Sequence, residues 1–544
     1  MNFDLPIISI DANPEFRDAK ACTEWLQTLP LINVGPSHGR LLGELEELNC
    51  CELAVSERLK ILELLREPVL FVQAEQAKKF SNRAVPLAKP EREILMNVVA
   101  LWTAFGYGYQ HCLQSLSGMP TGLVASGGQF ALACQRALWC ASQQIAEHFR
   151  CYQDISSDDW AQLHRLYAFA EEHKLTDQQV AHPVHKDQWK TTCMETYVQP
   201  LLLQAANPSE HTSRQLGLVA RWLDRWGNNA RVRRTAPVVE ASAAQPLLID
   251  LAERSGPRRL PHADDAPVTA PDTQRYLDLQ ELSKSIRSRR ALLKKGDAPA
   301  SLGLGDDVPA QLAEHLLALL HRQWCEGKLG RSLARKSASG VAELATGMGA
   351  MHFYISGLPF RQPGEAKELT KAQREEIATF GRISTHADDE YAVQHGLTLE
   401  QWHIRDESLA GLRLERKSGA GRFVHTQLMA VRPTDARHFL LGTTRWLMVD
   451  ENYDLKIGVR ALPGIPQGIA IRATGLNAMA DKYVPALMVS AVPALHSPES
   501  LVLPVGWFRP KRVIEVYTDK ARQMQLNAVL ERGADFERVA YEVV

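Results

Sequence analysis

Two arginines, Arg331 and Arg335, stand four residues apart in the sequence RSLAR. A guanidinium group offers five N–H donors in a planar fork, which can hold a phosphate through paired hydrogen bonds or bind the O6 and N7 atoms of guanine. The positions from 322 to 336 hold one acidic residue, Glu326, and five basic residues: Arg322, Lys328, Arg331, Arg335 and Lys336. This local excess of positive charge predicts a site for a small anionic ligand.

A second group with binding chemistry consists of Asp406, Ser408 and Gly411 in the sequence DESLAG. An ionised carboxylate only accepts hydrogen bonds, which suits the N1–H and N2–H2 edge of guanine. The Ser408 hydroxyl can reach a phosphate or a base, and Gly411 permits a sharp turn or a close backbone approach. The alternative is purely structural, because Asp and Ser often do no more than stabilise a turn.

Several common catalytic patterns are missing from the sequence. It contains no G-x-x-x-x-G-K-[ST] loop, no H-E-x-x-H pair and no cluster of cysteine and histidine with the spacing of metal ligands. We therefore expect a protein that binds a ligand but catalyses no reaction, and that needs neither a metal nor a cofactor.

Amphipathic helices are expected to dominate residues 1–225. Pro68 is expected to lie just past the end of the first long helix. Short polar breaks between the helices predict an antiparallel helical array, which could also serve as a surface for a protein partner. Apolar residues recur at helical spacing in the segments 53–66, 92–117, 129–150, 159–175, 188–205 and 214–226.

Residues 226–320 are expected to form a mixed linking segment, with one strand at 246–253, a proline-rich loop and two helices at 276–295 and 310–325.

From residue 338 the apolar period becomes two, and short strands alternate with Gly, Pro, Asn or Asp. The predicted strands are 341–346, 350–356, 402–405, 410–415, 423–431, 438–449, 455–461, 485–492, 500–505 and 511–517.

These strands predict a small antiparallel β-barrel over 321–475, interrupted by an insertion at 358–400, and a β-rich C-terminal extension over 476–544 that packs on or extends it. The expected fold class is multidomain α+β, with an all-α N-terminal region ahead of the barrel. A chain of 544 residues is long enough for three or four domains.

The barrel region resembles the PilZ domain family. The resemblance rests on R-x-x-x-R, then [DN]-x-S-x-x-G, then a hairpin that contains Gly442, Arg445, Trp446, Ile457, Gly458 and Val459. It covers roughly 321–470 and implies a β-barrel that binds the bacterial second messenger cyclic di-GMP. The residues that match the motifs are Arg331, Arg335, Asp406, Ser408 and Gly411. Trp446 is expected in the barrel core rather than as a stacking platform, because it lies mid-hairpin in an alternating strand.

The resemblance has one departure, because Arg335 and Asp406 are 71 residues apart in place of a few tens. An insertion that loops out of the barrel would explain the spacing. A rival arginine pair lies inside that insertion, Arg374 and Arg382, but its members are eight residues apart. A further alternative is a barrel that has kept its fold and lost its ligand.

The resemblance implies a bacterial effector whose arginine segment is mobile alone and folds against Asp406, Ser408 and Gly411 when cyclic di-GMP binds. The output would pass to an unidentified protein partner through the helical region, in type IV pilus function, motility or surface attachment. The alternative is a ligand-free scaffold or chaperone-like adaptor with a degenerate barrel.

The overall composition limits the partners and the location. With 62 Lys+Arg and 63 Asp+Glu the net charge is −1, which argues against a protein that coats a nucleic-acid polymer. The N-terminus lacks the basic region of a secretory signal, and no apolar run is long enough for a membrane span. The nine cysteines form no C-x-x-C pair, so we expect reduced thiols and a cytoplasmic location.

Overall fold

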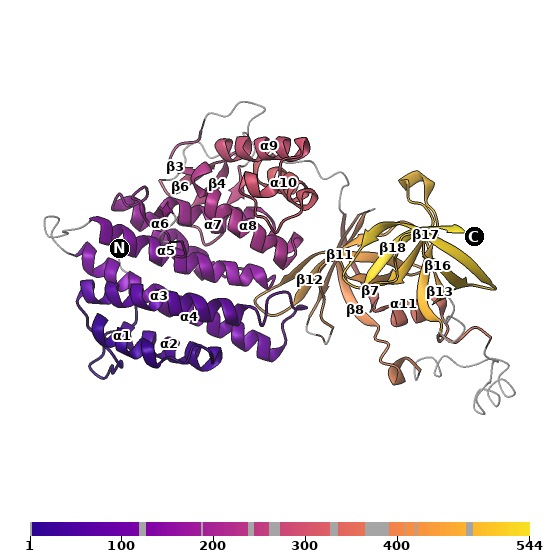
Figure 1. The fold of residues 1–544 in the computed structure, drawn as a ribbon, viewed down its shortest axis with the longest axis horizontal. Helices are drawn as coiled ribbons and strands as arrows, with labels where there is room; N and C mark the ends of the chain where they lie inside the picture. Colours follow the sequence, from indigo (N-terminus) through magenta and orange to yellow (C-terminus); the bar gives the residue numbers. More distant parts are fainter. Residues whose placement is uncertain are drawn as a thin grey trace. The chain divides into compact units, whose positions relative to one another are not determined.

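The computed structural model describes residues 3–118, 127–185, 189–237, 244–260, 272–326, 336–364, 391–408, 410–417, 419, 421–474 and 482–544. The chain divides into two compact units (Figure 1). The first consists of Met1–Arg83 with Leu87–Gly330, and the second of Ala84–Pro86 with Arg331–Val544. Among the described residues, no helix combines the length and the apolar character that a membrane crossing requires.

The first unit is mainly helical, as predicted, and Figure 1 shows α3, α4 and α5 side by side. Polar caps start several helices; Thr192 and Glu195, for example, each bind the other's backbone N–H at the start of α7. The helices are α1 (Ala19–Thr28), α2 (Val34–Asn49), α3 (Val55–Ala77), α4 (Lys89–Ser117), α5 (Gly127–Arg150), α6 (Ser157–Glu172), α7 (Cys193–Ala205), α8 (Ser213–Trp226), α9 (Gln280–Lys295) and α10 (Ala310–Cys325).

The prediction that the first long helix ends before Pro68 is wrong, because α3 continues to Ala77. A proline inside a helix removes one hydrogen bond and costs about 3 kcal/mol. The buried face of α3 continues on both sides of Pro68. Leu65 precedes the proline, Val69 and Val72 follow it, and all three belong to the core. Packing of this face outweighs the local cost.

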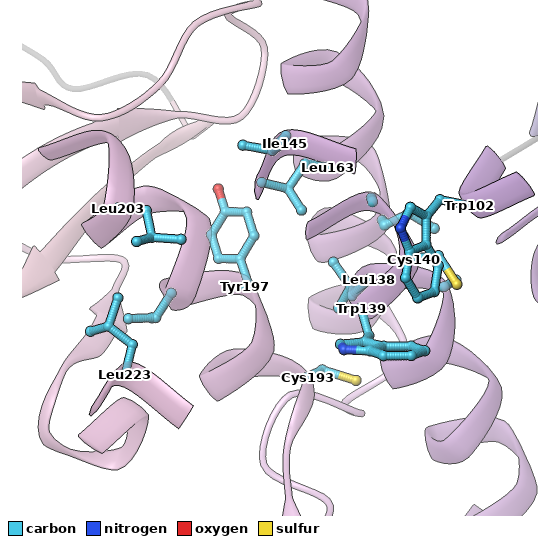
Figure 2. Packing of buried hydrophobic residues seen from close by; sticks show 14 of the residues in the cluster. Trp102, Leu138, Trp139, Cys140, Ile145, Leu163, Cys193, Tyr197, Leu203 and Leu223 are labelled. Carbon is cyan, nitrogen blue, oxygen red and sulfur yellow. The ribbon is translucent and has the colours of Figure 1, made fainter. Parts of the chain in front are cut away.

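Aromatic side chains fill the core between the helices, as Figure 2 shows around Trp102, Trp139 and Tyr197. The rings of Trp102 and Trp139 meet edge to face with centroids 5.1 Å apart. Tyr197 stacks on Tyr167 at 3.9 Å. All nine cysteines are free thiols, and all except Cys50 are buried.

Residues 226–320 contain both strands and helices, as predicted, but they belong to the first unit and do not form a linker. Their strands make a four-stranded sheet in the order β3-β6-β4-β5, and Leu277 from this sheet and Leu317 and Trp324 from α10 belong to the same core as the N-terminal helices. The sheet strands are β3 (Arg231–Arg233), β4 (Leu247–Asp250), β5 (Arg258–Arg259) and β6 (Gln274–Asp278), and a separate two-stranded ribbon pairs β1 (Val180–Ala181) with β2 (Lys190–Thr191).

The second unit contains two closed six-stranded barrels. The first consists of β7 (Lys336–Thr346), β8 (Glu400–Ser408), β9 (Gly411–Arg416), β10 (Leu428–Pro433), β11 (Leu440–Val449) and β12 (Leu455–Ala461). The second consists of β13 (Pro466–Ala473), β14 (Val484–Val489), β15 (Ser500–Pro504), β16 (Val513–Tyr517), β17 (Ala521–Arg532) and β18 (Phe536–Val543). The short segment Ala84–Pro86 belongs to this unit, since Val85 and Phe423 exchange backbone hydrogen bonds of 2.8 and 2.7 Å.

The two barrels have the same topology. Around each barrel the strands follow the order first, second, third, sixth, fifth, fourth, and the fourth closes on the first through β10–β7 or β16–β13. All pairs are antiparallel. Of the two alternatives predicted for 476–544, extension of the first barrel is wrong, because a complete second barrel begins at Pro466. Its closure leaves neither barrel with an open edge. The other alternative, packing on the first barrel, is confirmed by the buried cluster that the two barrels share.

The predicted strand at 350–356 is also wrong, because these residues form helix α11 (Met348–Ser356). The run AMHFYIS is almost wholly apolar, and a short apolar run does not distinguish a buried strand from a buried helix. Helix α11 lies in the connection from β7 to β8 and packs on β13 and β14. The remainder of the predicted insertion, 365–390, lies outside the described residues.

The two barrels share a seam inside the second unit. Leu428 and Leu441 of the first barrel and Leu487 and Phe536 of the second lie in one buried cluster. The Leu428 N–H donates to the Asp535 carboxylate at 2.8 Å. The barrels are therefore joined both by apolar packing and by specific polar contacts.

Candidate ligand site

The hairpin between β8 and β9 carries three of the five predicted ligand residues. Asp406 and Ser408 lie at the C-terminal end of β8, and Gly411 is the first residue of β9. Ser408 pairs with Gly411 across the hairpin, and its hydroxyl donates to the Gly411 carbonyl at 3.3 Å. The structure thus brings Asp406, Ser408 and Gly411 together at one end of the first barrel.

Gly411 is required by the close approach of β9 to β12. A Cβ atom at this position would lie 1.9 Å from the Val459 carbonyl oxygen and 3.2 Å from the Cα of Arg460. Any side chain would have to separate the two strands, so the last residue of the D-x-S-x-x-G pattern has a structural role.

A row of residues extends from Asp406 across the outer face of four strands. Asp406 pairs with Arg413 of β9, Arg413 pairs with Gly458 of β12, and Gly458 pairs with Trp446 of β11. The residues that alternate with this row, such as Leu414, Ile457 and Leu447, are buried inside the barrel. Register, rather than sequence distance, assembles an acid, an arginine and an aromatic ring on one surface.

Side chains in this row contact one another. The Arg413 guanidinium lies 4.0 Å from the Asp406 carboxylate and 5.9 Å from the centre of the Trp446 ring. The indole lies directly over Gly458, where a Cβ would be 2.0 Å from the indole nitrogen. The Nε–H of Arg413 is buried and has no hydrogen-bond partner among the described residues, so one donor of this guanidinium is unused.

The prediction that Trp446 is a barrel core residue is wrong. Trp446 is half-buried on the outer face, because the pairing of β11 with β12 shifts register between Thr444 and Trp446. Such a bulge reverses the alternation of side chains, so Leu447 points into the barrel where simple alternation would place Trp446. Sequence reasoning missed Arg413, because nothing in the residues around it indicates that it faces Trp446.

The arginine motif itself, Arg331 and Arg335, lies outside the described residues, and so does the rival pair Arg374 and Arg382. The structure does place the strand that follows the motif. β7 begins at Lys336, which pairs with Glu407, and the next residue, Ser337, pairs with Asp406. β7 and β8 are neighbours in the barrel despite the long connection between them.

The mouth of the first barrel holds a cavity of about 280 Å³ beside this hairpin. Ser408 and Gly411 line it together with mostly apolar residues, among them Leu412, Val431 and Val459. This lining suits an apolar group and not a phosphate.

Two other clusters have the residue types of functional sites but carry no site here. Residues 35–39 read G-x-S-x-G, yet Ser37 lies in helix α2 with its hydroxyl buried and donating to the Pro30 carbonyl at 2.7 Å.

The second cluster is acidic. Glu415, Asp450 and Asp454 lie close enough for a metal, but Arg405 pairs with Glu415, and Lys456 lies 2.8 Å from Asp450. We assign no metal to this acidic group.

Comparison with known proteins identifies the domains. Three family models match consecutive parts of the chain: the N-terminal domain of the cyclic-di-GMP receptor FimW at residues 20–237, its middle PilZ domain at 262–420 and its C-terminal β-barrel domain at 469–544. The chain is a PilZ-domain protein. The third match agrees with the second barrel seen in the structure, and the middle match includes the whole hairpin from Asp406 to Gly411.

The PilZ-domain protein is similar along most of its length to one curated relative, described as "Cyclic-di-GMP receptor FimW" from Pseudomonas aeruginosa PAO1. The two are 24% identical over 532 residues, which covers 90% of this chain and 85% of the relative. A solved structure titled "MrkH, A novel c-di-GMP dependence transcription regulatory factor" matches 35% of this chain and 91% of its own, at 8% identity and a TM-score of 0.13. A TM-score this low carries no argument about the fold.

Proposed function

We propose that this PilZ-domain protein is a cyclic di-GMP receptor that transmits the level of the second messenger to a protein partner and has no catalytic activity of its own. The observation that carries the proposal is the outer-face row Asp406–Arg413–Trp446 beside the Ser408–Gly411 hairpin. It occurs in a chain whose full-length relative is described as a cyclic-di-GMP receptor.

Each part of this surface suits one part of the ligand. The Asp406 carboxylate accepts from the N1–H and N2–H2 groups of a guanine. The half-buried Trp446 ring offers a face on which a base can stack, and the neighbouring Arg413 supplies a cation that can stack or donate. The two phosphates are left for Arg331 and Arg335, whose guanidinium forks fit them.

The covalent linkage supports the assignment of Arg331 and Arg335 over the rival pair. Lys336 follows Arg335 directly and pairs with Glu407, next to Asp406. Consecutive Cα atoms are about 3.8 Å apart, so covalent adjacency to Lys336 favours Arg335 as the source of a phosphate contact beside the hairpin. In the sequence, Arg382 lies eighteen positions before β8 begins at Glu400, and Arg374 lies further still.

The proposed output is control of a partner that binds the helical region, in type IV pilus function, motility or surface attachment. This part follows from family analogy. The alternative is a ligand-free scaffold. One observation supports it: the Ser408 hydroxyl donates a hydrogen bond to the Gly411 carbonyl, as in an ordinary turn.

Isothermal titration of the full chain with cyclic di-GMP tests the proposal. We expect micromolar or tighter binding that is lost in Arg331→Ala, Arg335→Ala and Asp406→Ala. Arg437→Ala, which removes an exposed arginine from the β10–β11 connection, is the matched control and should leave the affinity unchanged. An intact chain that does not bind would overturn the receptor assignment. Binding that survives all three site variants but is lost in Arg374→Ala would move the phosphate site to the rival pair.

A further inference from the structure

One exposed arginine beside the hairpin belongs to neither sequence motif. Arg460 lies near the end of β12, directly opposite Gly411 on one side and Thr443 on the other. The next residue, Ala461, donates its backbone N–H to the Ala410 carbonyl of the hairpin at 2.9 Å. Ser408, Gly411 and Arg460 thus form a second row on the barrel, next to the row that contains Asp406 and Arg413.

Arg460 pairs with an acid of the second barrel, Glu531 of β17. The side chain of Arg460 is 50% exposed, and it also donates a 3.5 Å hydrogen bond to the Thr443 hydroxyl. Glu531 follows a register shift in β17 after Val529, and such a bulge redirects the side chain that comes next. Arg460 therefore has donors exposed to solvent, and its only acidic partner among the described residues lies on the other barrel.

The equivalent strand of the second barrel shows the contrast. Its arginine, Arg538 of β18, is buried and donates to the Ser500 hydroxyl at 2.8 Å and the Ser497 hydroxyl at 2.7 Å. The residue that pairs with Arg538 in the third strand of the second barrel, Val502 of β15, carries a side chain, whereas Arg460 pairs with Gly411 of β9. Arg538 is thus bound internally, whereas Arg460 borders a position without a side chain.

We infer that Arg460 is a third arginine of the cyclic dinucleotide site, and that Glu531 competes with the ligand's phosphate for it; this inference rests on the proposed function. The ligand carries two negative charges and can approach Arg460 over Gly411, where no side chain intervenes. Glu531 offers a single negative charge in partly exposed surroundings, where an ion pair contributes little. Binding would exchange the Arg460–Glu531 pair for a phosphate contact and so release one of the polar contacts between the barrels.

Titration of the full chain with cyclic di-GMP at two salt concentrations tests this inference. Arg460→Ala should lower the affinity about tenfold or more and reduce its dependence on salt, because one charge–charge contact with the ligand is lost. Arg460→Lys should restore part of both. Glu531→Gln should raise the affinity a few fold, because it frees Arg460 and removes a negative charge near the phosphate.

The second barrel provides a matched control pair. Arg472 of β13 and Glu515 of β16 form a similar ion pair at 2.7 Å. Arg472→Ala and Glu515→Gln should leave both the affinity and its salt dependence unchanged. Thermal unfolding of each variant separates loss of binding from loss of fold.

The outcomes distinguish this inference from the proposed function. If the intact chain binds cyclic di-GMP and Arg460→Ala binds equally well with the same salt dependence, Arg460 is not part of the site and the receptor proposal still stands. If Glu531→Gln weakens binding, Glu531 positions Arg460 and does not compete, which overturns the competition. If the intact chain does not bind cyclic di-GMP, the proposed function is wrong, and the inference about Arg460 loses its basis.

Discussion

The two barrels of the second unit have the same strand order but different surfaces at the equivalent hairpin. In the first barrel only residues 409 and 410 separate β8 from β9, and the turn presents Asp406 and Ser408. In the second barrel the equivalent connection, from β14 to β15, spans residues 490–499 and includes a short 3-10 helix. The same topology therefore provides a compact polar corner in one barrel and a longer loop in the other.

The chain that enters each barrel differs as well. The first barrel is preceded by the basic segment with Arg331 and Arg335, and the second only by the four-residue connection 462–465, which contains no charged residue. A ligand site in such a barrel thus depends on the entering segment, on one tight hairpin and on the side chains that face outward beside it. The shared strand order supports the surface without specifying it.

The largest expected effect is a loss of stability, and measuring it in each barrel tests whether the two barrels are equally important for folding. Leu447 of β11 and Leu526 of β17 occupy the fifth strand of each barrel and are fully buried. Leu447→Ala and Leu526→Ala should each lower the free energy of unfolding by about 3 kcal/mol, because each leaves a cavity. Urea denaturation followed by tryptophan fluorescence measures this. A cost below about 1 kcal/mol in only one barrel would contradict structural equivalence.

The next effect addresses the tight hairpin of the first barrel. Gly411→Ala should cost about 2 kcal/mol and abolish ligand binding, because the new Cβ would collide with the Val459 carbonyl. Gly340→Ala in β7 is the control, since its Cβ would meet only Ile404 Cδ1 at 3.7 Å. Equal melting temperatures for the two variants would show that β9 does not approach β12 this closely.

A smaller effect distinguishes two half-buried tryptophans, Trp446 of β11 and Trp507 of the β15–β16 connection. Each lies under an arginine, with Arg413 5.9 Å from Trp446 and Arg512 5.2 Å from Trp507. Trp446→Ala should weaken cyclic di-GMP binding by about 1–3 kcal/mol, the contribution of one base–aromatic stack. Trp507→Ala should leave binding unchanged. Calorimetric affinities that fall alike in both variants would remove Trp446 from the site.

The smallest expected effect concerns the seam between the barrels and depends on pH. Burial raises the pKa of the Asp535 carboxyl, although its hydrogen bond from the Leu428 N–H acts in the opposite direction. The folded state therefore holds the proton more tightly than the unfolded state, and stability falls as the pH rises through the pKa of the folded state. Asp535→Asn keeps an acceptor without the charge, so it should raise the melting temperature slightly at neutral pH.

That gain should vanish in acid, where Asp535 of the parent protein is protonated as well. Melting curves of both proteins between pH 3 and 8 measure the difference. A gain that is independent of pH would mean that the buried charge is not its cause.

Much of the local structure was predictable from the sequence because it depends on near neighbours. Helical periodicity located the long helices of the first unit, and alternation located most strands of the barrels. The predictions failed where packing overrides local preference, as at Pro68 inside α3, or where an apolar run has no period, as at 350–356. The motif from Asp406 to Gly411 was also found from sequence, since all three residues lie on one hairpin.

The sequence by itself determined the residue chemistry of this protein: a basic segment, an acid–serine–glycine hairpin and strands short enough to close a barrel. Only the tertiary structure decided that Arg413 and Trp446 stand beside Asp406, that Arg460 reaches Glu531, and that the final strands close a second barrel. The physical reason is register. Pairing between strands far apart in the chain, with one bulge in β11, sets which side chains share a face, and a local pattern does not contain that information.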